Sequence, residues 1–193
     1  QASTSVAVDI SGFFKSDLIS IGRNDGIIRA GFNISNLGPK MKYSDLGQES
    51  FIPSNLKIGT GFEFLSNNSN SFTVSLEINK LLVPTPSEPI YDSTDSEIIS
   101  YKQEDISFLS GIFKSFGDAP DGSSEELKEL TYSLGLEYAF NQSFFLRTGY
   151  FSEHELKGSR KFLTLGTGFK TNSNLRFDLS YLISTSEIIS PLE

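Results

Sequence analysis

Few residues of this chain have the types and spacing that catalysis requires. His154 is the only histidine among the 193 residues, and it stands between Glu153 and Glu155 with no Gly-x-Ser-x-Gly motif. A hydrolase needs a nucleophile, a base and an orienting group. We therefore expect His154 to be a solvated loop residue. The chain has no cysteine, which excludes a disulfide, a thiolate metal site and a thiol nucleophile, and we expect no catalytic residue, metal or cofactor.

Two Gly-Thr-Gly runs, at residues 59–61 and 166–168, are short enough to suggest phosphate cradles. A phosphate cradle needs a helix directly after the glycines. Both runs lie inside predicted strands, so we interpret these glycines as small residues on a crowded inner face.

Charged residues recur at alternate positions and mix both signs, which predicts a structural network of paired charges on one side of the strands. A catalytic use of a few of these carboxylates stays open. The net charge of −8 argues against nucleic-acid binding. The charged residues expected in this network are Asp9, Arg29, Lys57, Glu63, Glu77, Glu137, Arg147, Glu153, Lys161, Lys170, Arg176 and Asp178.

The elements that would position these charges are strands, because apolar residues alternate with polar ones at a period of two. The segments at residues 56–64 and 72–79 are expected to form a hairpin. Eight segments show the pattern, at residues 5–15, 27–36, 56–64, 72–79, 130–140, 144–153, 161–170 and 175–183.

A soluble antiparallel sandwich and a transmembrane barrel both produce such alternation. Three features favour the barrel. The segments have ~9–12 residues, as a tilted membrane strand requires; Tyr138, Tyr150 and Tyr181 fit an interfacial aromatic girdle; and short turns alternate with long loops at residues 37–55 and 81–129. No apolar run is long enough for a membrane helix. We predict an all-β, antiparallel transmembrane β-barrel, with residues 1–193 forming one outer-membrane domain.

The alternation of loop lengths also predicts orientation. If the short turns face the periplasm, the last strand runs outward, the long loops are extracellular, and a closing strand is expected after Glu193. Eight strands is then a lower bound. Gln1 leads almost directly into a strand, so we expect the natural chain to begin earlier, and the end at Leu192 and Glu193 could be an artificial boundary.

The segment from residue 81 to 129 departs from the strand pattern. A Pro-rich stretch at its start is followed by an acidic spacer and then by apolar residues at helical spacing between Ile106 and Phe116. Gly117 and Pro120 would end this helix, and Ser123 with Glu126 could form a capping box for a further turn. An apolar helix in an extracellular loop would be buried either against its own barrel or against a partner protein.

Five segments, in order along nearly the whole chain, resemble the PorV (LptO) family of the Bacteroidota type IX secretion system, which is similar to FadL-type barrels. They are residues 30–40 (AGFNISNLGPK), 52–57 (IPSNLK), 79–86 (NKLLVPTP), 111–120 (GIFKSFGDAP) and 157–162 (KGSRKF). The resemblance implies a barrel of roughly fourteen strands, of which this chain would be the C-terminal portion, lacking the earlier strands and the last one.

The resemblance also implies a function without catalysis. Such proteins receive secreted cargo at the translocon barrel, bind the cargo's C-terminal signal domain and carry it to the sortase-like surface attachment complex. Outer-membrane lipid and lipopolysaccharide would surround the barrel. A FadL-like transporter of hydrophobic small molecules and a lipid A O-deacylase remain the alternatives. Because exposed apolar loop residues anchor interfaces best, our candidate partner-binding residues are Leu81, Leu82, Val83, Pro84, Ile112, Phe113 and Phe116.

Overall fold

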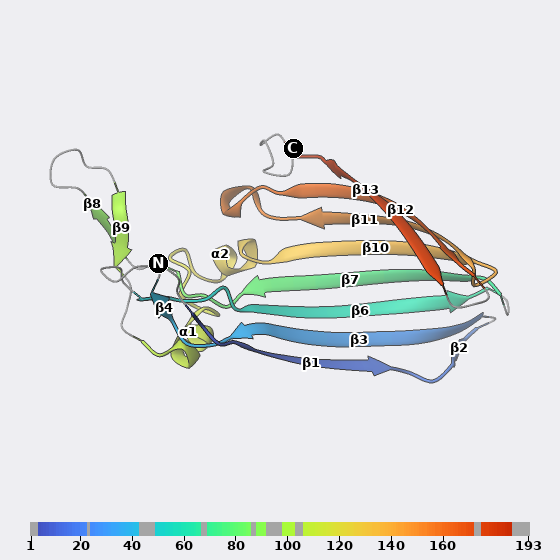
Figure 1. Cartoon of the computed structure of the whole chain (residues 1–193), viewed down its shortest axis with the longest axis horizontal. Coiled ribbons are helices and arrows are strands. Elements are labelled where there is room, and N and C mark those ends of the chain that lie inside the picture. The colour runs from blue at the N-terminus through green and yellow to red at the C-terminus, as the bar shows by residue number, and fades with distance from the viewer. Residues whose placement is uncertain are drawn as a thin grey trace. The chain divides into compact units, whose positions relative to one another are not determined.

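A computed structural model describes residues 4–22, 24–42, 49–66, 69–85, 88–91, 98–102, 106–171 and 175–186. Nine strands form one antiparallel sheet, ordered β1-β3-β6-β7-β10-β11-β12-β13, with β2 paired to β3 (Figure 1). Among the described residues the two outer strands of this order, β1 and β13, are not joined. The strands are β1 Val8–Lys15, β2 Ile19–Ile21, β3 Asn24–Leu37, β6 Asn55–Leu65, β7 Ser71–Leu81, β10 Thr131–Phe140, β11 Phe144–Ser152, β12 Lys161–Lys170 and β13 Arg176–Ser184.

The predicted all-β antiparallel architecture with a helical insertion is confirmed, and the open sheet is consistent with a barrel fragment. Each of the eight predicted segments overlaps a strand of this sheet. The number of strands in a closed barrel, the FadL-like relationship, the single domain and the orientation of the loops stay predictions.

The strand register gives the sheet one apolar and one polar face. Tyr138 lies opposite Phe72 on β7 and Leu146 on β11, while the adjacent residue Glu137 lies opposite Thr73 and Arg147. Tyr138, Phe72 and Leu146 all remain exposed. Water-soluble proteins rarely leave such a continuous apolar surface exposed. The exposed apolar face is therefore consistent with contact with lipid.

Aromatic side chains of the apolar face gather beside the short turns. Phe140 pairs with Phe144, Phe144 with Phe169, and Phe169 with Phe177, and all four are exposed. This row resembles an interfacial girdle. Of the three predicted girdle tyrosines, Tyr138 lies near this row, whereas Tyr181 pairs with Leu165 in the middle of its strand, so the prediction fails for Tyr181.

The turn between β10 and β11 follows from two residues with positive φ. Asn141 and Gln142 have φ of 51° and 52°, and the Ser143 N–H donates to the Phe140 carbonyl at 3.1 Å. This is the geometry of a type I′ hairpin, which matches the twist of the flanking strands. The predicted turn at residues 171–173 and the tip of the turn at residues 66–70 lie partly outside the described residues.

Short strands within the long loops were not predicted. β4 (Met41–Lys42) pairs with β5 (Glu49–Ser50), and β8 (Glu88–Tyr91) pairs with β9 (Ile98–Lys102) in the acidic spacer. Strands of two to five residues are too short to show an alternating pattern, which is why the sequence did not reveal them.

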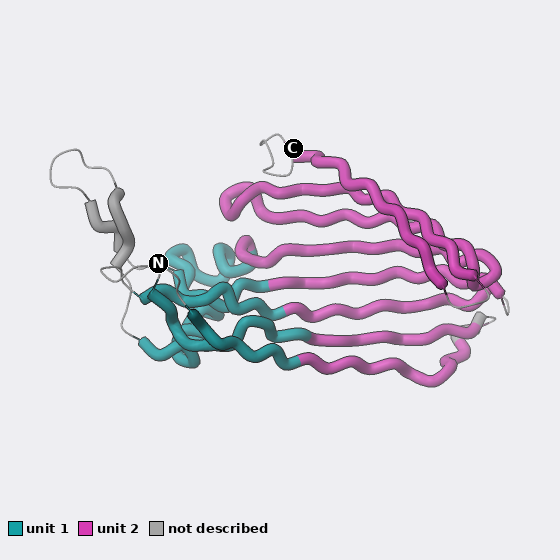
Figure 2. Tube along the Cα trace, viewed as in Figure 1, with its two compact units in different colours: residues 1–10, 33–56, 80–127 teal, residues 11–32, 57–79, 128–193 magenta. Residues whose placement is uncertain are grey.

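The chain divides into two compact units (Figure 2). Unit 1 comprises residues 1–10, 33–56 and 80–127 and contains α1 (Phe108–Lys114) and all of α2 (Ser123–Lys128) except its last residue. Unit 2 comprises residues 11–32, 57–79 and 128–193 and contains strands β10 to β13 and the 3₁₀ helix η1 (Glu155–Lys157). In the described part of the chain, each helix is too short or too polar to span a membrane.

The predicted capping box at Ser123 is wrong in detail. The α2 turn does form, but the carbonyl of Gly122 accepts the N–H groups of Glu125 and Glu126, so Ser123 is already inside the helix. The Glu126 carboxylate accepts from the Ala119 N–H instead of the backbone of Ser123. Tertiary contacts with residues outside the helix therefore decide the position of this side chain.

Candidate partner-binding surface

Helix α1 is built from local signals that the sequence contains. The Ser107 hydroxyl caps its first turn by accepting the Ser110 N–H at 3.2 Å. Gly111 is buried, and a Cβ at this position would lie 2.5 Å from the Phe51 ring and 3.1 Å from Pro84. A glycine is thus required for this side of α1 to approach its neighbours closely.

The opposite side of α1 is apolar and exposed. Leu109, Phe113 and Phe116 follow one another at spacings of four and three residues, which places them along one side of the helix and its C-terminal extension. All three are at least half exposed, and 77% of Phe113 is accessible. We name Leu109, Phe113 and Phe116 the α1 surface.

The structure separates the predicted partner-binding residues into exposed and packed ones. Phe113, Phe116 and Leu81 are exposed, and Val83, Pro84 and Ile112 are half-buried. Leu82 is only 3% exposed, and its N–H donates to the Ser54 carbonyl at 2.8 Å. The assumption of exposure is therefore wrong for Leu82, whose side chain belongs to the core of unit 1.

A buried ion pair lies in the same unit. The Lys80 ammonium is 2.9 Å from Oε2 of Glu126, and their side chains are 7% and 14% exposed. Loss of hydration raises the pKa of Glu126, but hydrogen bonds from Lys80 and from the Ala119 N–H outweigh it and lower this pKa below its ordinary value. Glu126 therefore remains ionised and paired at neutral pH.

Sequence reasoning did not include Leu109, Lys80 or Glu126 in the site. Leu109 could have been found, because it precedes Phe113 by one helical turn. Lys80 and Glu126 are 46 residues apart in sequence, and no spacing rule relates such positions.

His154 lies in the short connection between β11 and β12, as predicted. It is exposed, and Nδ1 accepts the Leu156 N–H at 3.2 Å, which caps η1. The neighbouring Glu153 is buried and accepts two hydrogen bonds from the Arg160 guanidinium, at 2.7 and 2.8 Å. The hydrogen bonds from Arg160 lower the pKa of Glu153. This loop is thus held by an ion pair and a cap.

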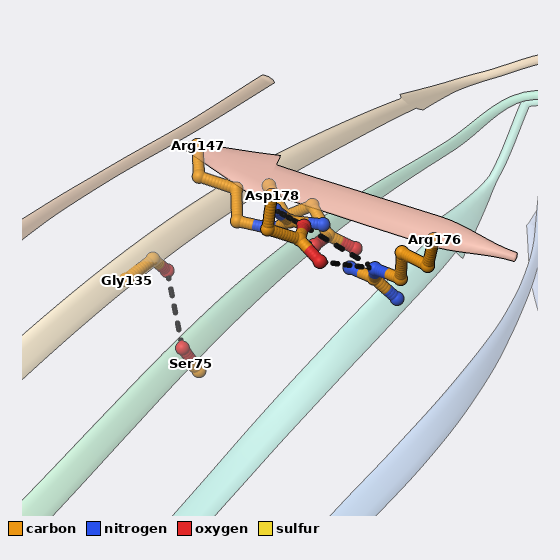
Figure 3. A network of polar contacts seen from close by, with 6 residues as sticks. Ser75, Gly135, Arg147, Arg176 and Asp178 are labelled. Atoms are coloured by element: carbon orange, nitrogen blue, oxygen red, sulfur yellow. Dashed lines mark hydrogen bonds and ion pairs between the residues drawn. The ribbon is translucent and has the colours of Figure 1, made fainter. Parts of the chain in front are cut away.

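The polar face carries the predicted charge network (Figure 3). Arg147 on β11 forms ion pairs with Glu137 and, at 2.6 Å, with Asp178, and Asp178 also pairs with Arg176 at 2.9 Å. On the preceding strands Arg29 pairs with Glu63, and Lys57 lies 3.9 Å from Glu77. The predicted pairing of opposite charges is confirmed at these positions.

Both Gly-Thr-Gly runs lie within strands, as predicted. A Cβ on Gly168 would lie 2.4 Å from Oδ1 of Asp178, so this glycine makes room for the charge network. Among the described residues, no three His, Asp or Glu side chains cluster in a way that could hold a metal ion.

Comparison with protein families finds a match for the N-terminal part of the chain. Residues 1–88 match the model of the type IX secretion system protein PorV. The matched part of the chain belongs to the PorV family. No curated protein matches the chain.

The PorV match includes three of the five segments that carry the resemblance, at residues 30–40, 52–57 and 79–86. Leu81 to Pro84 lie inside the PorV match, and the α1 surface lies outside it. The match supports the assignment of the chain to the type IX secretion system. This family, together with a sheet that exposes an apolar face, fits an outer-membrane protein.

Proposed function

We propose that this protein binds secreted cargo through the cargo's C-terminal signal domain and carries it from the translocon to the cell-surface attachment complex. It does so as a binding protein without catalysis, with its long loops outside the cell. The PorV match supports the secretion role. The α1 surface is the docking site on this protein. Leu81 and the half-buried Val83 are further candidate contacts, whereas Pro84 lies against Gly111 on the packed side of α1.

The exposure of Phe113 is the observation that carries this proposal. Phe113 is 77% accessible, although the other side of its helix is packed. Exposure of this apolar ring to water is unfavourable in free energy. Its burial at an interface would contribute to binding, which aromatic anchors dominate. Gly111 and Ser115 are buried on the packed side of α1. The anchor is thus preformed, which reduces the entropy lost on binding.

The two alternatives receive less support from the described residues. A transporter for hydrophobic molecules needs an apolar route, but the polar face contains the ion pairs of Arg147, Asp178 and Arg176. A deacylase needs an activated nucleophile, and His154 is engaged in capping η1.

Substitution of Phe113 by alanine tests the proposal. Leu156→Ala is a matched control, because Leu156 is 74% exposed in the β11–β12 connection but is not part of the α1 surface. In a deletion strain, we expect Phe113→Ala to cause unprocessed cargo to accumulate in the periplasm and Leu156→Ala to restore secretion. Normal secretion in the deletion strain, accompanied by altered lipid uptake or altered lipid A acylation, would contradict the proposal.

The same pair of variants predicts a change in affinity. Burying a whole Phe side chain contributes about 1.5–3 kcal/mol. Since 77% of Phe113 is available for burial, its truncation should weaken binding of a purified cargo C-terminal domain by roughly 5- to 50-fold. Calorimetric titration with the full-length protein measures this difference. Equal affinities of Phe113→Ala and Leu156→Ala would show that docking occurs elsewhere.

A further inference from the structure

The buried Lys80–Glu126 pair joins segments that are distant in sequence. Lys80 is near the end of β7, and Glu126 is in α2. Oε2 of Glu126 accepts from the Lys80 ammonium and Oε1 accepts from the Ala119 N–H, both at 2.9 Å. One carboxylate therefore connects β7, the segment between the two helices, and α2.

A second contact joins the same parts of unit 1. Oδ2 of Asp118 accepts the Thr85 N–H at 2.8 Å. Residues 80–85 are thus tied at both ends to residues 118–126, once by a charge pair and once by a charge-assisted hydrogen bond. Such bonds are shorter and stronger than neutral ones.

The pair is also connected to the α1 surface. The Lys80 ammonium lies 5.9 Å from the centroid of the Phe116 ring, within the range of a cation–π interaction. Pro84, in the tied segment, lies against Gly111 on the packed side of α1. Contacts of residues 80–85 therefore reach both the exposed and the packed side of α1.

An ion pair that is shielded from water contributes to the local structure only while both partners are present. Removing the carboxylate charge of Glu126 takes away the ion pair of a lysine side chain that is only 7% exposed, and loss of one partner of a shielded ion pair destabilises the surrounding structure. The pair therefore helps to hold α2 and the segment before it against residue 80.

We propose that Lys80 and Glu126 are positioning residues of the cargo-docking site, whose ion pair holds α1 so that the α1 surface is presented to cargo in a preformed arrangement. They act through α1 and do not themselves contact cargo. This inference rests on the proposed function, because it takes the α1 surface to be the docking site.

The test compares Glu126→Gln with Glu77→Gln in the full-length protein. Glu77 also lies near a lysine, Lys57, but both side chains are about half exposed, so its neutralisation leaves no buried charge. Two quantities are measured: affinity for a purified cargo C-terminal domain, and hydrogen exchange of the Ala119 and Thr85 amides.

We expect Glu126→Gln to speed exchange at Ala119 and to weaken cargo binding by about tenfold, since affinity falls in proportion to the fraction of molecules in the binding-competent state. Glu77→Gln should leave both unchanged. If Glu126→Gln fails to assemble, Asp118→Ala replaces it and should change both readouts in the same direction. Faster exchange with unchanged affinity overturns the inference.

Including Phe113→Ala distinguishes the two proposals. Weaker binding in Phe113→Ala with unchanged binding in Glu126→Gln overturns the positioning role alone. Unchanged binding in both variants overturns the docking site and the positioning role together. Weaker binding in both, with faster exchange only in Glu126→Gln, supports both proposals, because a contact residue and a positioning residue differ in this readout.

Discussion

Replacing Leu134 by arginine would test whether the apolar face of the sheet contacts lipid. Leu134 is exposed on the apolar face of β10, between Leu76 and Tyr150. Ser133, the preceding residue, is on the polar face opposite Glu77. Ser133→Arg is therefore a matched control, since it introduces the same side chain on the same strand but next to a carboxylate.

The depth of Leu134 follows from the strand. Tyr132 and Phe140 are the first and last exposed aromatic residues of β10, and eight residues at ~3.4 Å each separate them by about 27 Å along the strand. A tilt of about 40° reduces this to about 20 Å of depth, near the ~25 Å height of a barrel's apolar band. Leu134, two residues beyond Tyr132, then lies about halfway between the interface and the midplane.

An arginine on the lipid face costs about 2–4 kcal/mol at the midplane and about 0–1 kcal/mol at the interface. The intermediate depth gives an expected loss of about 2 kcal/mol for Leu134→Arg, a roughly 25-fold change in the folding equilibrium. Phe140→Arg, at the end of the strand, should cost less than about 1 kcal/mol. Unfolding by urea in phospholipid vesicles, followed by circular dichroism, measures these values.

The order of the three variants decides the outcome. Leu134→Arg should be the least stable, and Ser133→Arg should be close to the unsubstituted protein. Equal losses for Leu134→Arg and Ser133→Arg, or a larger loss for Ser133→Arg, would refute the assignment of the apolar face to lipid.

Three further predictions concern the connections between strands. Gly158 has φ of +138°, and a Cβ there would lie 2.3 Å from Glu153. Gly158→Ala should therefore make the β11–β12 connection more sensitive to proteolysis. Gly122→Ala should increase the sensitivity of the α2 turn less, because Gly122 has φ of +71° but open space around it. The lowered pKa of Glu153 means that its ion pair contributes stability above the ordinary glutamate pKa of ~4.3 and loses it as the pH falls through the folded-state value. The protection factors of the amides in this loop, which correct for the intrinsic pH dependence of exchange, should therefore fall on acidification, and Glu153→Gln should abolish that dependence. Gln142→Gly should stabilise the β10–β11 hairpin by up to about 1 kcal/mol, because φ is +52° at Gln142 and a type I′ turn favours Asn-Gly; a lower urea midpoint for this variant would contradict it.

The sequence determined the strands and the two faces of the sheet. A strand shows successive side chains on opposite faces, so long alternating segments such as residues 130–140 indicate β10 without knowledge of its partners. The same period assigned Arg147 and Asp178 to one face before their contact was seen. Helix α1 was also predictable in outline, because its signals, from Ser107 to Gly117, are local.

Tertiary structure alone decided which loop residues are exposed and which are buried. Leu81 and Leu82 are neighbours of the same type, yet Leu81 is exposed and Leu82 is in the core, since the Leu82 N–H bonds to Ser54 and its side chain turns inward. Likewise, the sequence suggested only a local capping role for Glu126 and no contact for Lys80. Only the meeting of β7 with α2 makes them a buried pair, because contacts between residues distant in the chain have no sequence period that could reveal them.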